Sequence, residues 1–257
     1  MADFKNLIED MATYQHEEKI QPVSPVELDK IILNRRSVRY YTDEKIPQEV
    51  VEKVLHWGLL APNSSNLQPW EFYWVKSADK KTLMVEALMS QPAASTAQEL
   101  IVAVAKRKTW KKVSQDMLKQ LNDTPNVPQA AKDYYNKIVP LAYSVGPFGI
   151  LGPFKKLALN ITGLFKPMPR GPASVADMRV WAVKSTALAC ENIMLGFSAF
   201  GYDSCPMEGF DSARVGKILE LSCGDEVVMV ISAGKRSPKG VYGPRIRMPD
   251  KNFIKII

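Results

Sequence analysis

The chain has 257 residues, of which 46% are hydrophobic and 24% are charged. These values are typical of a globular protein that buries a sizeable core, and they exclude an intrinsically disordered chain. The net charge of +7 favours anionic ligands, and because both signs are spread along the chain without a long basic tail, we attribute the excess to cofactor and substrate steering and expect no nucleic-acid partner.

Cysteine usage and hydropathy indicate where the protein works. Cys190, Cys205 and Cys223 are an odd number without a C-x-x-C pair, which argues against a disulfide framework or a structural zinc. We therefore expect a reducing, cytoplasmic setting. The N-terminus lacks the basic and apolar regions of a secretory signal. The uncharged run 138–154 is interrupted by three prolines and three glycines, so it is too short and too broken to span a bilayer.

The first half of the chain contains clear helix and strand patterns. Residues 25–33 are predicted to be a helix, with Ser24 as its N-cap and Pro25 at its first position. A second helix is predicted to start at Pro47, because the apolar residues that follow recur at i, i+3 and i+4, and to stop near Gly58 to Pro62. Further on, the patterns predict two strands and an intervening helix, at residues 71–75, 100–105 and about 80–89.

Residues 106–180 are the least regular part of the sequence. They are rich in lysine and then in proline and glycine, and we interpret them as an inserted helical or irregular excursion within a single domain that spans 1–257. Apolar residues interleave with lysines over 151–159. Two interpretations stay open: an ordinary helix packed on the core, which we favour, and an amphipathic segment that contacts a membrane through residues 150–165.

The last part of the chain returns to regular patterns. Residues 180–200 are rich in Ala, Leu and Met without proline, which predicts a long buried helix. Asp211 is expected to cap a helix over 212–221, and 227–231 is a third strong strand. The chain ends in the apolar tail 253–257.

Three arginines and a serine fall within five residues just after the first predicted helix, at Arg35, Arg36, Ser37 and Arg39. In an extended backbone Arg35, Ser37 and Arg39 would point the same way. Guanidinium forks and a hydroxyl suit a phosphate, because planar bidentate donors match its oxygens. Taken alone, however, the stretch is better explained as a solvated charge run.

Several common chemistries lack their motifs. The sequence contains no G-x-G-x-x-G after a predicted strand, no G-x-x-x-x-G-K-[ST], no H-E-x-x-H and no G-x-S-x-G. We interpret His16 and His56, the only histidines, as surface or hydrogen-bonded residues. Cys205 has no motif that supplies a base, so a structural role is favoured over a nucleophilic one.

Three other segments complement the arginine stretch. Arg245 and Arg247 add a second basic pair; Asn66 and Gln68 place amides in the turn-rich loop 61–70; and the turn Pro206–Gly209 exposes backbone N–H groups. Flavin mononucleotide needs such groups, because its phosphate takes cationic forks, its ring edge takes amides, and an N–H near N5 tunes hydride transfer. Taken singly, the Asn66 and Gln68 loop and the Pro206–Gly209 segment are better explained by ordinary turn chemistry.

In this order the four motifs resemble those of the FMN-dependent nitroreductase family, specifically its oxygen-insensitive NAD(P)H nitroreductase branch. The motifs are R-x-S-x-R, A-P-N-S-S-N-L-Q-P-W, C-P-M-E-G-F-D and P-R-I-R-M-P, within residues 27–105 and 180–257. The resemblance implies an α+β fold with a mixed β-sheet flanked by helices. It also implies an intertwined homodimer with both flavin sites at the interface, in which the apolar tail adds a strand to the partner's sheet.

The same resemblance implies the site residues and the cofactors. The arginines and Ser37 would hold the FMN phosphate and ribityl region, Asn66 the flavin edge, and the Glu208 and Gly209 backbone would face N5 and O4. No catalytic side chain and no metal are implied. NAD(P)H would dock transiently and pass a hydride through flavin N5 to an electron-poor acceptor such as a nitroaromatic or a quinone. The expected cofactor-binding set is Arg35, Arg36, Ser37, Arg39, Asn66, Gln68, Pro206, Met207, Glu208, Gly209, Arg245 and Arg247.

Alternative functions remain at this point. R-R-S-V-R also resembles the related flavin-dependent reductive dehalogenases, so a dehalogenase or an ene-reductase is an alternative, although C-P-M-E-G-F-D argues against it. A non-catalytic flavin-binding or membrane-peripheral module would use the apolar and basic part of the insertion. Nucleic-acid binding driven by the net charge is a third alternative.

Overall fold

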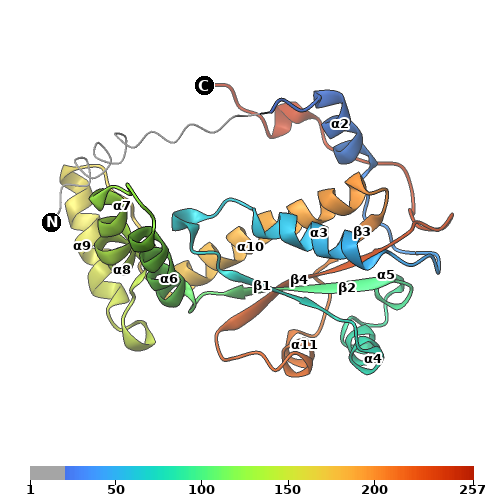
Figure 1. The fold of residues 1–257 in the computed structure, drawn as a ribbon, viewed down its shortest axis with the longest axis horizontal. Helices are drawn as coiled ribbons and strands as arrows, with labels where there is room; N and C mark the ends of the chain where they lie inside the picture. Colours follow the sequence, from blue (N-terminus) through green and yellow to red (C-terminus); the bar gives the residue numbers. More distant parts are fainter. Residues whose placement is uncertain (1–20) are drawn as a thin grey trace.

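The computed structural model describes residues 21–257, so the interpretations of His16 and of the extreme N-terminus concern residues outside the described part. A four-stranded sheet lies between two layers of helices (Figure 1). Its strands run in the order β1-β2-β4-β3 and are β1 Trp70–Trp74, β2 Glu99–Lys106, β3 Asp203–Met207 and β4 Asp225–Gly234. All three ladders are antiparallel, and the parallel pairing of the expected mixed sheet is limited, in the described residues, to the isolated bridges Ser37–Ser204 and Cys223–Asp225.

Two long helices cover one face of the sheet. They are α3 Gln48–Leu59 and α10 Val175–Ala199, and both were predicted. α10 begins five residues earlier than expected, because Ser174 and Asp177 form a capping box. Ahead of α3 lies the predicted helix α2 Pro25–Asn34, whose N-cap residue Ser24 makes no side-chain cap hydrogen bond.

The opposite face of the sheet carries shorter helices. Side chains alternate along β2, so that Ile101 and Ala103 join the core beneath α3 and α10 while Val102 and Val104 join the core on the other side. Asp211 accepts hydrogen bonds from two N–H groups of the last of these helices, as its capping role predicts. The helices on this side are α4 Ala78–Ala87, α5 Pro92–Ser95 and α11 Ser212–Ile218.

Residues 106–180 are more regular than the sequence indicated. Their prolines start helices instead of breaking them, since Pro140 and Pro153 lie in the first turns of two of them. The expected packing of 151–159 on the core is wrong, because Gly152 is the only buried residue of the helix that contains this stretch, Gly152–Phe165. The segment contains α6 Trp110–Asp123, α7 Gln129–Asp133, the π-helix Tyr134–Ile138, α8 Val139–Tyr143, the 3-10 turn Pro147–Gly149 and α9 Gly152–Phe165.

Strand β3 corrects the interpretation of Pro206–Gly209 as a turn. Pro206 and Met207 are strand residues, and only Glu208 and Gly209 lie in the exposed loop that follows. A proline is tolerated here because β3 is at the edge of the sheet, where one side of the strand needs no ladder partner. The prediction failed because proline and glycine, here at Pro206 and Gly209, are both residues typical of turns.

The remaining features of the fold concern the cysteines, possible metal ligands, membrane spans and the end of the chain. Cys190 and Cys205 are buried as free thiols, and Cys223 is free and exposed. Among residues 21–257, no three His, Cys, Asp or Glu side chains gather as metal ligands. Within the same range, no helix is both long and apolar enough to cross a membrane. After the 3-10 turn Asp250–Asn252, every residue of the apolar tail 253–257 is exposed.

We expect Gly196→Ala to destabilise the protein. A Cβ at Gly196 would lie 2.9 Å from both Trp57 Cε3 and Val54 Cγ1, where α10 meets α3. Overpacking costs about 1–3 kcal/mol, against about 1 kcal/mol gained from helix propensity, so urea denaturation should show a net loss of stability. Gly216→Ala in α11 is the matched control, because a Cβ there meets no atom within 4 Å. Equal effects of the two substitutions would contradict this packing.

Candidate functional site

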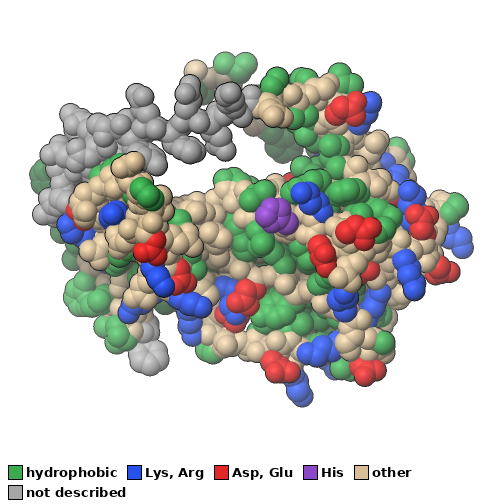
Figure 2. Space-filling model, in the orientation of Figure 1, with side chains coloured by type: hydrophobic (Ala, Val, Ile, Leu, Met, Phe, Trp, Pro, Cys, Tyr) green, Lys and Arg blue, Asp and Glu red, His purple; other side chains and the backbone are tan. Residues whose placement is uncertain are grey.

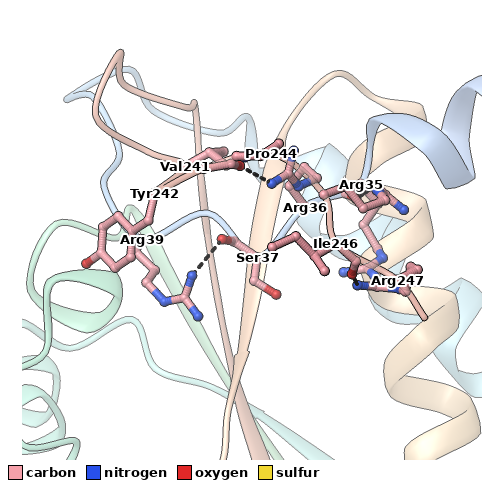
Figure 3. A pocket seen from close by; sticks show the side chains of 11 residues that line it. Arg35, Arg36, Ser37, Arg39, Val241, Tyr242, Pro244, Ile246 and Arg247 are labelled. Atoms are coloured by element: carbon pink, nitrogen blue, oxygen red, sulfur yellow. Dashed lines mark hydrogen bonds between the residues drawn. The ribbon is translucent and has the colours of Figure 1, made fainter.

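The two arginine-containing segments form one cavity of about 260 Å³ (Figure 3). One wall comes from the stretch after α2 and the other from the segment after β4. The structure therefore brings together the basic residues that the sequence placed more than two hundred positions apart. The lining residues are Arg35, Arg36, Ser37, Arg39, Val241, Tyr242, Gly243, Pro244, Arg245, Ile246 and Arg247.

The backbone of the arginine stretch is fixed by its neighbours. Val38 N–H donates to Ser204 O at 3.2 Å, and Arg39 N–H donates to Gly240 O at 2.8 Å. The side chain of Val38 is fully buried in the core. Because side chains alternate in an extended stretch, the burial of Val38 turns Ser37 and Arg39 toward the cavity, as predicted.

The cavity concentrates positive charge. Among residues 21–257, Arg35 is the one lining arginine with a carboxylate within 4 Å, at 3.8 Å from Glu191. The Arg245 guanidinium donates to Arg35 O at 2.5 Å, so the backbone holds it in place. Desolvation, followed by the charges of Arg247, Arg36 and Arg35, lowers the pKa of Arg245. Like charges held this close repel, and a bound anion would relieve that repulsion.

Two further contacts orient the guanidinium groups. Arg36 donates to the carbonyl oxygen of Gly243 at 2.6 Å. The Arg39 guanidinium lies 5.0 Å from the centre of the Tyr242 ring, within the range of a cation–π contact (Figure 3). These contacts use carbonyl and aromatic partners, so the positive charge is not neutralised. A singly or doubly charged oxyanion such as a phosphate fits this donor set, because its oxygens accept from planar guanidinium forks.

The amides of Asn66 and Gln68 lie on a tightly held loop before β1. Ser65, Asn66 and Gln68 all have left-handed backbone conformations, with φ of 58°, 48° and 45°. Such conformations cost energy in non-glycine residues and persist only where the surroundings impose them. Leu67 is fully buried, and Gln68 N–H donates to Asn63 Oδ1 at 2.8 Å.

Tyrosines from the 106–180 segment clamp the same loop. Tyr143 Oη is 2.7 Å from Ser64 Oγ, and Tyr134 Oη is 2.7 Å from Ser65 Oγ. Tyr135 Oη donates to Ser65 O at 3.1 Å. No sequence pattern indicates these contacts, because tyrosines in a segment without a motif do not show which residues they will touch. The irregular π-helix places two of them on the loop.

The loop after β3 presents a backbone donor. Gln91 Nε2 donates to Gly209 O at 3.0 Å, which fixes the orientation of that residue. Among the described residues, Gly209 N–H has no hydrogen-bond acceptor. A Cβ added at Gly209 would meet no atom within 4 Å, and its φ is not in the left-handed region. Neither packing nor backbone conformation within this chain requires a glycine there, whereas the close approach of a ligand would.

The structure separates the amide loop from the arginine cavity. The strand pairings locate both regions along β4. Trp70, next to the loop, pairs with Ala105, which pairs with Glu226 of β4. Ser37 of the arginine stretch bridges Ser204, which pairs with Ala233 of β4. Seven residues along β4 and the width of the sheet therefore lie between them, roughly 25 Å in all. Figure 1 shows the two regions toward opposite ends of the molecule. Within one chain, Asn66 and Gln68 cannot contact a ligand held by the arginines.

Comparison with known proteins gives a consistent result. The model of the nitroreductase family matches residues 32–150 and 155–235, including most of the 106–180 segment. A protein of Thermus thermophilus named NADH dehydrogenase is 25% identical over 224 residues, which cover 86% of this chain and 92% of that one. The chain spans nearly the whole of this relative.

Solved structures share the fold. The Bacillus subtilis protein ydfN has a TM-score of 0.72 at 22% identity, covering 91% of this chain and 100% of that chain. A structure from Exiguobacterium sibiricum, in complex with FMN, has a TM-score of 0.65 at 21% identity, covering 93% of this chain and 100% of that chain. At these identities the likeness shows the α+β fold, which confirms the predicted fold class.

Proposed function

The chain belongs to the nitroreductase family, and we propose that it is an FMN-dependent oxidoreductase that passes a hydride from NAD(P)H to a small electron-poor acceptor such as a nitroaromatic or a quinone. The observation that carries the proposal is the arginine cavity, whose positive charge is largely uncompensated. The name of the Thermus relative and the FMN in the Exiguobacterium structure support a nicotinamide donor and a flavin.

The residues of the cavity fit the phosphate end of FMN. Four of its arginines have no carboxylate within 4 Å among the described residues, and the Ser37 hydroxyl lies between them. Gly209 N–H, which lacks an acceptor in residues 21–257, fits the flavin ring as a donor near N5. When bound, FMN supplies the hydride carrier that NAD(P)H reduces and the acceptor oxidises. No side chain has to act as a nucleophile or strong base.

We place each flavin site between two subunits of a homodimer. One subunit would supply the arginines and Gly209, and the other would supply Asn66 and Gln68, because roughly 25 Å separates the two regions within one chain. This distance exceeds the length of one mononucleotide. The exposed apolar tail 253–257 would add to the partner's sheet and bury its isoleucines. Residues 1–257 would then form one domain in each subunit.

The first test is the absorbance spectrum of the purified protein, followed by anaerobic titration with NADH and NADPH. We expect the visible bands of bound flavin and their bleaching by at least one nicotinamide, because hydride transfer reduces the ring. A colourless protein that fails to bind added FMN would sink the proposal. Binding without reduction would instead favour a non-catalytic flavin-binding module.

We expect Arg39→Ala to weaken FMN binding by about tenfold or more, since a hydrogen bond to a charged group contributes about 1.5–3 kcal/mol. Riboflavin, which lacks the phosphate, should bind both proteins equally in fluorescence titrations. Arg214→Ala is the matched control, because Arg214 pairs with Glu86 and Asp211 away from the cavity. Equal losses for FMN and riboflavin would contradict a phosphate contact.

The two-subunit site predicts complementation. Arg39→Ala and Asn66→Ala homodimers should each have two defective sites, whereas a heterodimer of the two variants combines both defects in one site and leaves the other intact. Co-expressed, differently tagged subunits should therefore recover roughly half of the wild-type FMN reduction per dimer. A heterodimer no more active than either homodimer would contradict this division of the site.

A further inference from the structure

Helix α9 turns its apolar side away from the protein. Phe154, Leu164 and Phe165 are 71%, 78% and 84% exposed. With the exposed Leu157 and Ile161 they recur at helical spacing and form one face of the helix. Figure 2 shows hydrophobic side chains at the lower left edge of the molecule, where Figure 1 places α9.

Two glycines lie at the closest contacts on the inner side of α9. A Cβ at Gly152 would lie 2.6 Å from Ala173 O, and one at Gly163 would lie 2.3 Å from Arg170 Cζ. The helix therefore packs against residues 170–173 through these glycines. Leu159 is half-buried, and the other large apolar side chains of the helix stay exposed. An ordinary surface helix buries its apolar stripe against the core, whereas α9 exposes most of its large apolar side chains.

The segment around α9 contains positive charge only. Between Asp133 and Asp177 there is no Asp or Glu, but there are five basic residues. Lys137 pairs with Asp133 at 2.7 Å, and Lys155 donates to Ala142 O inside the segment. Arg170 donates to Asn160 Oδ1 and Gly163 O on the inner side of α9. The other two, Lys156 and Lys166, are exposed and, among residues 21–257, have no carboxylate within 4 Å.

We propose that the outward face of α9 docks on the surface of an anionic lipid bilayer. The apolar face would enter the boundary between headgroups and acyl chains, and the flanking cations would meet lipid phosphates. The 14-residue helix is roughly 20 Å long, too short to cross a hydrocarbon core of about 30 Å, so it lies in the surface. Self-association through this face is disfavoured, because two such faces would bring like charges together.

Vesicle sedimentation of the full-length protein tests the proposal. Vesicles of mixed phosphatidylcholine and phosphatidylglycerol should bind the wild type more strongly than pure phosphatidylcholine, and salt should weaken that binding. Leu164→Gln with Phe165→Gln should lower the partition coefficient by about tenfold or more, because two apolar side chains no longer enter the bilayer. Leu83→Gln in α4 is the matched control, since Leu83 is also exposed.

Charge reversal provides the second arm. Lys156→Glu with Lys166→Glu should lower binding to the anionic vesicles, whereas Lys80→Glu with Lys217→Glu, on exposed positions of α4 and α11, should change it little. No binding to anionic vesicles, or equal binding by the α9 variants and the wild type, would overturn the proposal. A change of oligomeric mass in the Leu164/Phe165 variant, measured by light scattering, would overturn it in favour of a contact between copies of the chain.

Discussion

The fold depends on a central strand that is buried on both faces. Every residue of β2 from Leu100 to Ala105 is at most 2% exposed. A strand without a solvent face needs apolar cover on each side, so α3 and α10 close one face while α4 and α11 close the other. The functional segments are consequently displaced to the edges of the sheet. The arginine stretch bridges the edge strand β3, and the amide loop leads into the other edge strand, β1.

This displacement is the physical reason for proposing a two-subunit site. A cofactor that needs both cationic forks and amides cannot obtain them from one chain whose two edges are far apart, but a twofold dimer can bring the edge of one subunit to the opposite edge of its partner. The exposed apolar tail 253–257 fits this picture, because within the described residues its isoleucines have no apolar cover.

The sequence predicted the elements whose patterns are local. Helix α3 follows from apolar spacing, the α11 cap from Asp211, and strand β2 from its continuous apolar run. The pairing of Arg39 with Tyr242 and the contact of Tyr143 with Ser64 were beyond prediction, because they depend on tertiary placement of segments far apart in the chain. β3 was missed because the turn propensity of Pro206 and Gly209 outweighed the burial of Cys205 and Met207, which only the finished sheet reveals.

The α9 helix and the amide loop are joined by one short series of contacts. Lys155 of α9 donates to Ala142 O and Ser144 O, on either side of Tyr143, and the Tyr143 hydroxyl contacts Ser64 and Ser65, next to Asn66. The 106–180 segment thus has an outward apolar face and an inward set of hydroxyl groups. Physical connection alone is not coupling, which would require two arrangements of this segment that both sites bias. The contacts do show that α9 and the loop that carries Asn66 and Gln68 are close neighbours at one end of the subunit.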